Sequence, residues 1–325
     1  MAFTRDELQF SSLYATRFAG SFGFMTVMTL LPTYIEALGA TGVTIGLFIT
    51  ALELARTVGI VPLAWAGDRY SKRVLLVVAL AVSAVAYVVF AGVSSIEGFL
   101  VARVLQGLGL TGTGLLSLAL IGELAPDDGR ANYIGKYNAF RMAAGIAGTL
   151  GAGILYALTG FGVLFGLLTV LLVVAAVSVW AFVESDNTQI EGFAFTDLAM
   201  NRRILTLTSF RAQYAVAVTL VRKWVPIFVG VSAAQGGLAY GTVVVGAVLA
   251  VEKFTNMLCQ PLAGRLSDER GRALFVFLGG GVYGLLAFAF PFAPAFDDFL
   301  RFSLPMAGEI TGAVVLVFLL NGLLG

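Results

Sequence analysis

The sequence has 325 residues, of which 59% are hydrophobic and 12% are charged, and its mean hydropathy is +0.93. An average soluble domain is about 25% charged, so this chain has more apolar surface than a soluble core can bury, and we expect an integral membrane protein. A net charge of +1 gives no sign of a nucleic-acid partner, and the lack of histidine together with a single cysteine, Cys259, excludes an internal disulfide and a His/Cys metal site.

Apolar stretches of about 20 residues, the length that a helix needs to cross a bilayer core, recur along the chain. Runs such as 74–90 do not alternate apolar and polar residues, so they predict helices rather than the strands of a barrel. The predicted spans are 14–35, 43–66, 74–93, 99–121, 133–156, 161–183, 204–229, 234–260 and 273–292. The expected fold class is therefore all-α, a polytopic membrane bundle of about nine complete spans.

The two ends of the sequence bear on whether the first and last spans are complete. The first ten residues lack the basic and apolar pattern of a signal peptide, so the first span should stay in the mature protein. A tenth span begins near residue 313, but the 13 residues from there to Gly325 are too few to cross a membrane. We therefore expect an incomplete chain.

The positions of lysine and arginine predict the orientation. Basic residues gather before the first span and in every second connection after it, whereas the other connections hold only Arg301. Since cytoplasmic segments are enriched in basic residues, we expect a multi-pass protein of the cell membrane with a cytoplasmic N-terminus. The basic residues of the predicted cytoplasmic side are Arg5, Arg69, Lys72, Arg73, Arg130, Lys136, Arg202, Arg203, Arg265, Arg270 and Arg272.

A polar segment and an internal repeat divide the chain into two halves. Residues 184–203 form the polar linker between a six-helix half, 1–183, and an incomplete half, 204–325. The loop AWAGDRYSKRVLL at 64–76 and the loop GRLSDERGRALFV at 264–276 superimpose after a shift of 200 residues, which places Asp68 on Asp268. A repeat at matched places in the two halves indicates duplication.

These loops resemble the Gly-x-x-x-Asp-(Arg)-x-Gly-Arg/Lys signature of the major facilitator superfamily. The first copy has Ala64 and Ser71 where the signature has glycine, and the second copy keeps both glycines. The anchors that match are Asp68, Arg69, Lys72 and Arg73 in the first copy and Gly264, Asp268, Gly271 and Arg272 in the second. The resemblance implies two pseudo-symmetric six-helix halves that expose a central site alternately to each side of the membrane.

The aspartate of each loop is a candidate for a latch. Asp68 or Asp268 at the end of a span can pair with a cation and accept N–H groups from a neighbouring helix end, which would stabilise one conformation. The alternative is a solvated pair within an ordinary basic cytoplasmic loop, which contributes little energy.

The fourth predicted span carries Arg103, Gln106 and Gly107, which are similar to the family's Arg-x-x-Gln-Gly motif. An arginine inside an apolar span is costly, so Arg103 should face the bundle interior, unless it extends to the membrane surface instead. The glycine pattern of the fifth span is half present, because Thr149 stands where the family's proton antiporters usually have proline. That difference weakens an antiport assignment.

Two acidic residues within the spans are candidates for proton coupling. Glu53 precedes Asp68 by 15 residues, and Glu252 precedes Asp268 by 16, so they should lie at nearly the same depth in the two halves. Burial and a nearby cation act in opposite directions on the charge of such carboxyls, which is how proton sites are tuned. The alternative is that each acid belongs to a structural ion pair. Glu53 would pair with Arg56 one turn away, and Glu252 with an arginine or lysine of a neighbouring span.

The remaining intramembrane arginines suggest a polar or anionic substrate. Arg17, Arg141 and Arg211 either contact such a substrate or balance the two acids. Arg17 and Arg211 lie in the first span of each half and could face each other across a central cavity.

By resemblance, the function we expect is secondary transport of a small organic solute, with proton-coupled efflux of a drug or metabolite favoured. The alternatives are a proton- or sodium-coupled importer of a nutrient or organic acid, and a membrane sensor or partner-binding subunit that transports nothing. We expect no enzyme activity and no metal, because the chain has no histidine and only one cysteine that could form a catalytic or metal site with the carboxylates near Glu123. We also expect no cofactor, and a monomer in the lipid bilayer.

Overall fold

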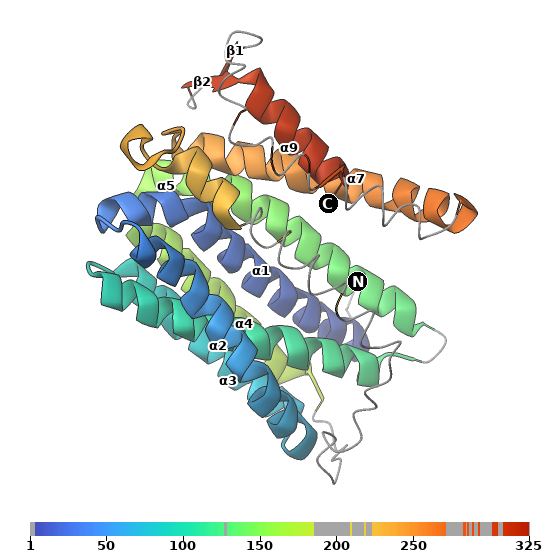
Figure 1. Cartoon of the computed structure of the whole chain (residues 1–325). Helices are drawn as coiled ribbons and strands as arrows, with labels where there is room; N and C mark the ends of the chain where they lie inside the picture. Colours follow the sequence, from blue (N-terminus) through green and yellow to red (C-terminus); the bar gives the residue numbers. More distant parts are fainter. Residues whose placement is uncertain are drawn as a thin grey trace. The chain divides into compact units, whose positions relative to one another are not determined.

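The computed structural model describes residues 4–126, 129–184, 223–270, 301–304 and 308–324, with isolated positions at 209, 218, 282, 283, 285, 288 and 292. Nearly all of these residues are helical (Figure 1). Six of the described helices are long and apolar enough to cross a membrane. The predicted span 204–229 lies mostly outside the described residues, and 273–292 does so almost entirely, so the total number of spans stays a prediction.

The first four helices coincide with the first four predicted spans, except that α3 ends two residues before the predicted end of the span 74–93. They are α1 (Arg5–Ala37), α2 (Val43–Arg69), α3 (Lys72–Ala91) and α4 (Ile96–Leu124). The turn between α1 and α2 contains Gly39 and Gly42, whose φ angles of 61° and 50° favour glycine. Ser95 caps α4 by accepting a hydrogen bond from the Gly98 N–H at 3.1 Å.

Helix α5 (Arg130–Phe182) contains two predicted spans, 133–156 and 161–183. Its 53 residues would extend about 80 Å as one straight helix, far more than a bilayer core. Gly160 interrupts it with φ 72° and ψ −174°, a conformation that residues with a Cβ rarely adopt. The break separates two stretches that are each long enough to cross a membrane.

The C-terminal part contains a short helix at 223–230, a 3₁₀ turn η2 (Ala233–Gln235), α7 (Thr242–Arg270) and α9 (Gly312–Leu324). Helix α7 overlaps the predicted span 234–260. Strands β1 (Arg301–Leu304) and β2 (Gly308–Thr311) pair antiparallel, with Arg301 opposite Thr311. This hairpin is the one pair of strands among the described residues, and the expectation of an all-α chain did not include it.

The chain forms two compact units. The first contains 1–27, 37–148 and 155–194, and the second contains 28–36, 149–154 and 195–325. The end of α1 and a short part of α5 therefore belong to the second unit.

In the first unit, α4 packs against both α2 and α3. Its glycines allow this close approach: a Cβ on Gly107 would lie 2.6 Å from the Leu52 carbonyl oxygen, and one on Gly112 would lie 2.7 Å from the Ala79 Cβ. Any larger residue at these positions would push the helices apart. The glycine-rich stretch 107–114 thus serves helix packing, as its place in an apolar span predicts.

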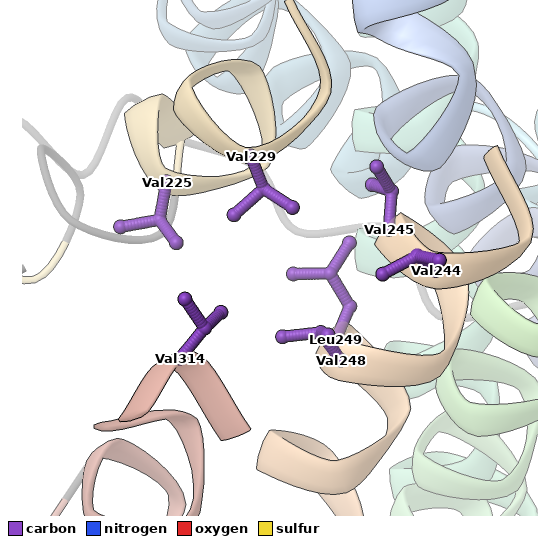
Figure 2. Packing of buried hydrophobic residues seen from close by; sticks show 7 residues of the cluster. All are labelled: Val225, Val229, Val244, Val245, Val248, Leu249 and Val314. Carbon is purple, nitrogen blue, oxygen red and sulfur yellow. The ribbon is translucent and has the colours of Figure 1, made fainter. Parts of the chain in front are cut away.

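The second unit has an aliphatic core that joins the helix at 223–230, α7 and α9. Figure 2 shows its seven buried residues, which are Val225, Val229, Val244, Val245, Val248, Leu249 and Val314. Within the same unit, Pro32 of α1 packs on Gly230. A Cβ on Gly153 of α5 would lie 2.6 Å from the Thr242 carbonyl oxygen. The backbones of α5 and α7 therefore approach closely at a glycine.

We predict that Gly107→Ala destabilises the protein, because the added methyl group meets backbone that cannot rotate away. Overpacking of this kind costs about 1–3 kcal/mol. Gly122→Ala is the matched control, since Gly122 lies on the same helix and a Cβ there has no neighbour within 4 Å. Thermal unfolding of the two variants in detergent measures the effect, and equal melting temperatures would contradict the prediction.

Candidate functional site

Arg103 lies at the centre of the first unit and is fully buried. Its Nε donates to the Phe48 carbonyl oxygen of α2 at 2.8 Å, and its Nη1 donates to Gln106 Oε1 at 2.8 Å. The guanidinium also lies over the Phe99 ring, 6.0 Å from its centroid. These contacts place the charge inside the unit and tie α4 to α2.

The hydrogen bonds of Arg103 continue through Gln106 to Tyr87. Gln106 Nε2 donates to the Tyr87 hydroxyl of α3 at 3.1 Å, and the Tyr87 ring stacks on Phe165 of α5 with the centroids 6.1 Å apart. Tyr87 also lies directly against Gly23 of α1, where a Cβ would collide with the hydroxyl. The motif of span 4 thus begins a network that reaches every helix of the first unit.

Glu53 and Arg56 form an ion pair on α2. Arg56 Nη1 lies 3.0 Å from Glu53 Oε2, and the two side chains are 40% and 33% exposed. The charge of Glu53 also acts favourably on Arg103. Glu53 therefore lies among cations, and its role in proton coupling stays a prediction.

Arg17 of α1 and Arg141 of α5 make no hydrogen bond or ion pair with any residue that the structure describes. The Arg17 guanidinium lies over the Tyr137 ring, 5.1 Å from its centroid. Arg56 and Arg141 are close enough to Arg17 for their charges to repel it. We call Arg17, Arg56 and Arg141 the arginine cluster.

Tyr137 fixes the position of the ring beneath Arg17. Its hydroxyl lies 2.7 Å from Ser117 Oγ and donates to the Gly114 carbonyl oxygen at 3.1 Å, both on α4. A Cβ on Gly114 would lie 3.1 Å from Arg17 Nη1, so the glycine leaves room for the guanidinium. The cluster thus combines two cations that form no hydrogen bond or ion pair with the described residues, and the ring of Tyr137 supports one of them, Arg17.

The first signature loop holds three helix ends together. Lys72, the buried first residue of α3, pairs with Glu123 of α4 at 2.9 Å. Arg73 donates to the Val183 carbonyl oxygen at 3.2 Å and lies over the Trp180 ring, 4.8 Å from its centroid. The start of α3 is therefore joined to the ends of α4 and α5.

The other two anchors of this loop face outward. Arg69 lies over the Trp65 ring of its own helix, 4.6 Å from the centroid. Asp68 is exposed and makes no hydrogen bond or ion pair within the described part of the chain. The proposed latch therefore stays a prediction at Asp68.

The second loop and the C-terminal candidates are described only in part. Gly264 and Asp268 lie in α7, and Glu252 is buried in the same helix. Gly271, Arg272 and Arg211 lie outside the described residues. Among the residues that are described, no group of three or more His, Cys, Asp or Glu side chains could hold a metal ion.

Several partners of the predicted residues do not follow from the sequence patterns. Glu123, for which the sequence favours no catalytic role, pairs with Lys72, and Trp180 supports Arg73. The signal available for Glu123 was its place at the end of an apolar span whose neighbouring helix begins with two cations. Nothing in the sequence pattern points to Tyr87 as the partner of Gln106.

Three curated proteins show local similarity to the chain. An uncharacterised MFS-type transporter, MJ1560, of Methanocaldococcus jannaschii is 29% identical over 142 residues, which are 44% of this chain and 35% of that protein. The inner membrane transport protein YajR of Escherichia coli is 31% identical over 170 residues, 51% of this chain and 36% of its own. The low-affinity glucose transporter HXT1 of Saccharomyces cerevisiae is 28% identical over 93 residues, 28% of this chain and 16% of its own. The chain thus covers about a third or less of each relative.

Two solved structures share the fold. A bacterial homologue of the human lysosomal transporter Spinster, inward-facing and unoccupied, has a TM-score of 0.68 at 16% identity, with 99% of this chain and 74% of that chain covered. A mutant of the nucleoside transporter NupG has a TM-score of 0.72 at 15% identity, with 97% and 79% covered. At these identities the likeness concerns the fold alone.

Almost all of the chain matches one family. The sequence profile of the Major Facilitator Superfamily matches residues 13–325. This match agrees with the apolar helices, with the solved structures that share the fold and with the resemblance of the two loops and the span-4 motif. The chain belongs to the Major Facilitator Superfamily and is a multi-pass membrane protein.

Proposed function

We propose that this chain is a secondary transporter that moves a small organic solute across the cell membrane by alternating access. The observation that carries the proposal is the arginine cluster: three guanidiniums lie inside the membrane-spanning part, and two of them, those of Arg17 and Arg141, form no hydrogen bond or ion pair with the described residues. Charges at that depth mark substrate or ion pathways. No cofactor is required, because an ion gradient supplies the driving force.

Alternating access requires contacts that can separate and close again, and the second unit offers suitable ones. Gly153 meets Thr242, Gly246 meets Thr149, and Gly230 meets Pro32, all without an ion pair between them. We propose that these contacts close one end of the pathway in the conformation described. Glycine contacts separate at little cost because they rely on dispersion forces alone.

For coupling, we propose that protons drive transport through Glu53 or Glu252. Glu53 is half-exposed and neighbours the arginine cluster, so a change in its charge alters the field that a bound solute experiences. Efflux by antiport is the direction we favour, with import by symport as the alternative. The names of the relatives indicate organic solutes for those proteins, which supports an organic solute here.

The direction of coupling can be measured with the purified chain in proteoliposomes. We expect labelled solutes from a broad panel to accumulate when the lumen is acidic, because an antiporter exchanges outgoing protons for incoming solute. Accumulation with an alkaline lumen would instead indicate symport and an importer. If neither gradient gives uptake above that of protein-free liposomes, the chain does not transport on its own, and the sensor alternative gains.

The coupling residue can be identified from the pH dependence of transport. We expect the rate to become nearly independent of pH in Glu53→Gln or in Glu252→Gln, whichever carries the proton, because glutamine cannot titrate. Glu97→Gln is the control, since Glu97 is exposed at the start of α4. Unchanged pH profiles in both test variants would refute the assignment.

The closing contact can be tested at Gly153. We expect Gly153→Ala to lower the transport rate roughly 10-fold, because an extra methyl group against the Thr242 carbonyl costs about 1–3 kcal/mol in the closed state alone. Gly162→Ala on the same helix, where a Cβ has no neighbour within 4 Å, should transport normally. Both variants should insert into the membrane like the parent. A normal rate in Gly153→Ala would show that this contact does not close the pathway.

A further inference from the structure

We propose that the arginine cluster recognises an anionic group, a carboxylate or a phosphate, on the transported solute. This inference rests on the transport function proposed above. It narrows the solute from any small organic compound to an organic anion.

The balance of charge around the cluster is the first argument. Arg56 of α2 and Arg141 of α5 lie close enough to Arg17 of α1 for their charges to repel it. Within the described part of the chain, Glu53 is the one anion in an ion pair with any of the three, and its partner is Arg56. Glu53 also interacts with Arg103, so its single negative charge is shared. An anion that enters this region would offset the excess positive charge.

Unused hydrogen-bond donors are the second argument. The Nε atoms of Arg17 and Arg56 are buried and have no hydrogen-bond partner among the described residues. Arg141 makes no hydrogen bond there, and it is exposed. Arg103 provides the comparison, because it has the same side chain in the same unit and donates to two acceptors. The fold therefore satisfies one arginine and leaves donors free on the cluster.

The geometry around Arg17 is the third argument. The Tyr137 ring lies against the guanidinium and is itself held by Ser117 and by the Gly114 carbonyl oxygen. A guanidinium that stacks on a fixed ring keeps its planar set of donors oriented, which suits bidentate recognition of carboxylate and phosphate. A neutral solute would leave these donors and the net charge uncompensated.

The test measures binding to the full 325-residue chain in phosphatidylcholine nanodiscs, through the melting temperature at increasing ligand concentration. Benzoate is compared with neutral benzamide, and glucose 6-phosphate with glucose. We expect at least one anion to raise the melting temperature while its neutral counterpart does not, because a ligand stabilises the state that it binds. The pair that responds distinguishes carboxylate from phosphate.

Two variants connect binding to the cluster. Arg141→Gln should weaken binding of the anion about tenfold or more, because a charged hydrogen-bond donor is lost. Arg130→Gln removes the same charge from the same helix outside the cluster, and binding should stay within about twofold of the parent. Arg17→Lys keeps the charge but loses the planar set of donors, so it should also weaken binding of the anion. It replaces Arg141→Gln in the test if that variant is hard to purify.

Three results would overturn the proposal. Benzamide or glucose could bind as tightly as its anionic counterpart, or Arg141→Gln and Arg17→Lys could both bind the anion like the parent. The third is a rise in melting temperature with phosphatidylglycerol in the nanodisc and none with soluble anions, which would assign the cluster to a lipid headgroup.

Binding and transport are measured separately, so the two proposals can fail independently. Anion binding that depends on Arg141, without accumulation in proteoliposomes, would refute transport and leave the anion site intact. Transport of neutral solutes at the parental rate by Arg141→Gln would refute the anion site and leave the transport function intact.

Discussion

The cost of holding a positive charge inside a bilayer shapes this protein. Arg103 meets that cost with a backbone acceptor on α2 and a side-chain acceptor on its own helix, and the chain of hydrogen bonds continues to Tyr87. Buried networks of this kind are stable only when every member is satisfied. Arg103 is therefore best understood as a structural tie, and the same fold leaves Arg17 and Arg141 available for another role.

The first signature loop shows how a family-like motif serves the fold itself. Lys72 is buried against Glu123, and Arg73 contacts the last turn of α5 through both a carbonyl oxygen and an aromatic ring. Buried, directional contacts of this kind are worth more than the solvated pairs of an ordinary surface loop. They make the first unit rigid at the end where Asp68 is exposed, so Asp68 is held in place while it has no described partner.

The sequence predicted the helices well, because span length and apolar composition are local properties. Helices α1–α4, the break between 156 and 161 and the packing role of glycines 107–114 all agree with the structure. Partners were harder to predict. The acceptor for Arg103 is the backbone carbonyl oxygen of Phe48, and a pattern of side chains cannot predict a backbone acceptor. The pairing of Lys72 with Glu123 depends on how α3 packs against α4. The strand pair at 301–311 depends on weak local preferences that hydropathy does not detect.

Glycine packing and the arginine cluster belong to one arrangement. Gly148 lets α5 approach α1 so closely that a Cβ there would lie 2.7 Å from the Phe22 carbonyl oxygen, and Gly114 leaves space for the Arg17 guanidinium. This close approach brings Arg17 onto Tyr137 and within range of Arg141. Larger residues at these two positions would separate α1 from α5 or displace the guanidinium, and the positive charges would disperse. The small residues therefore do more than pack helices, because they concentrate the charge that makes an anion the favoured occupant.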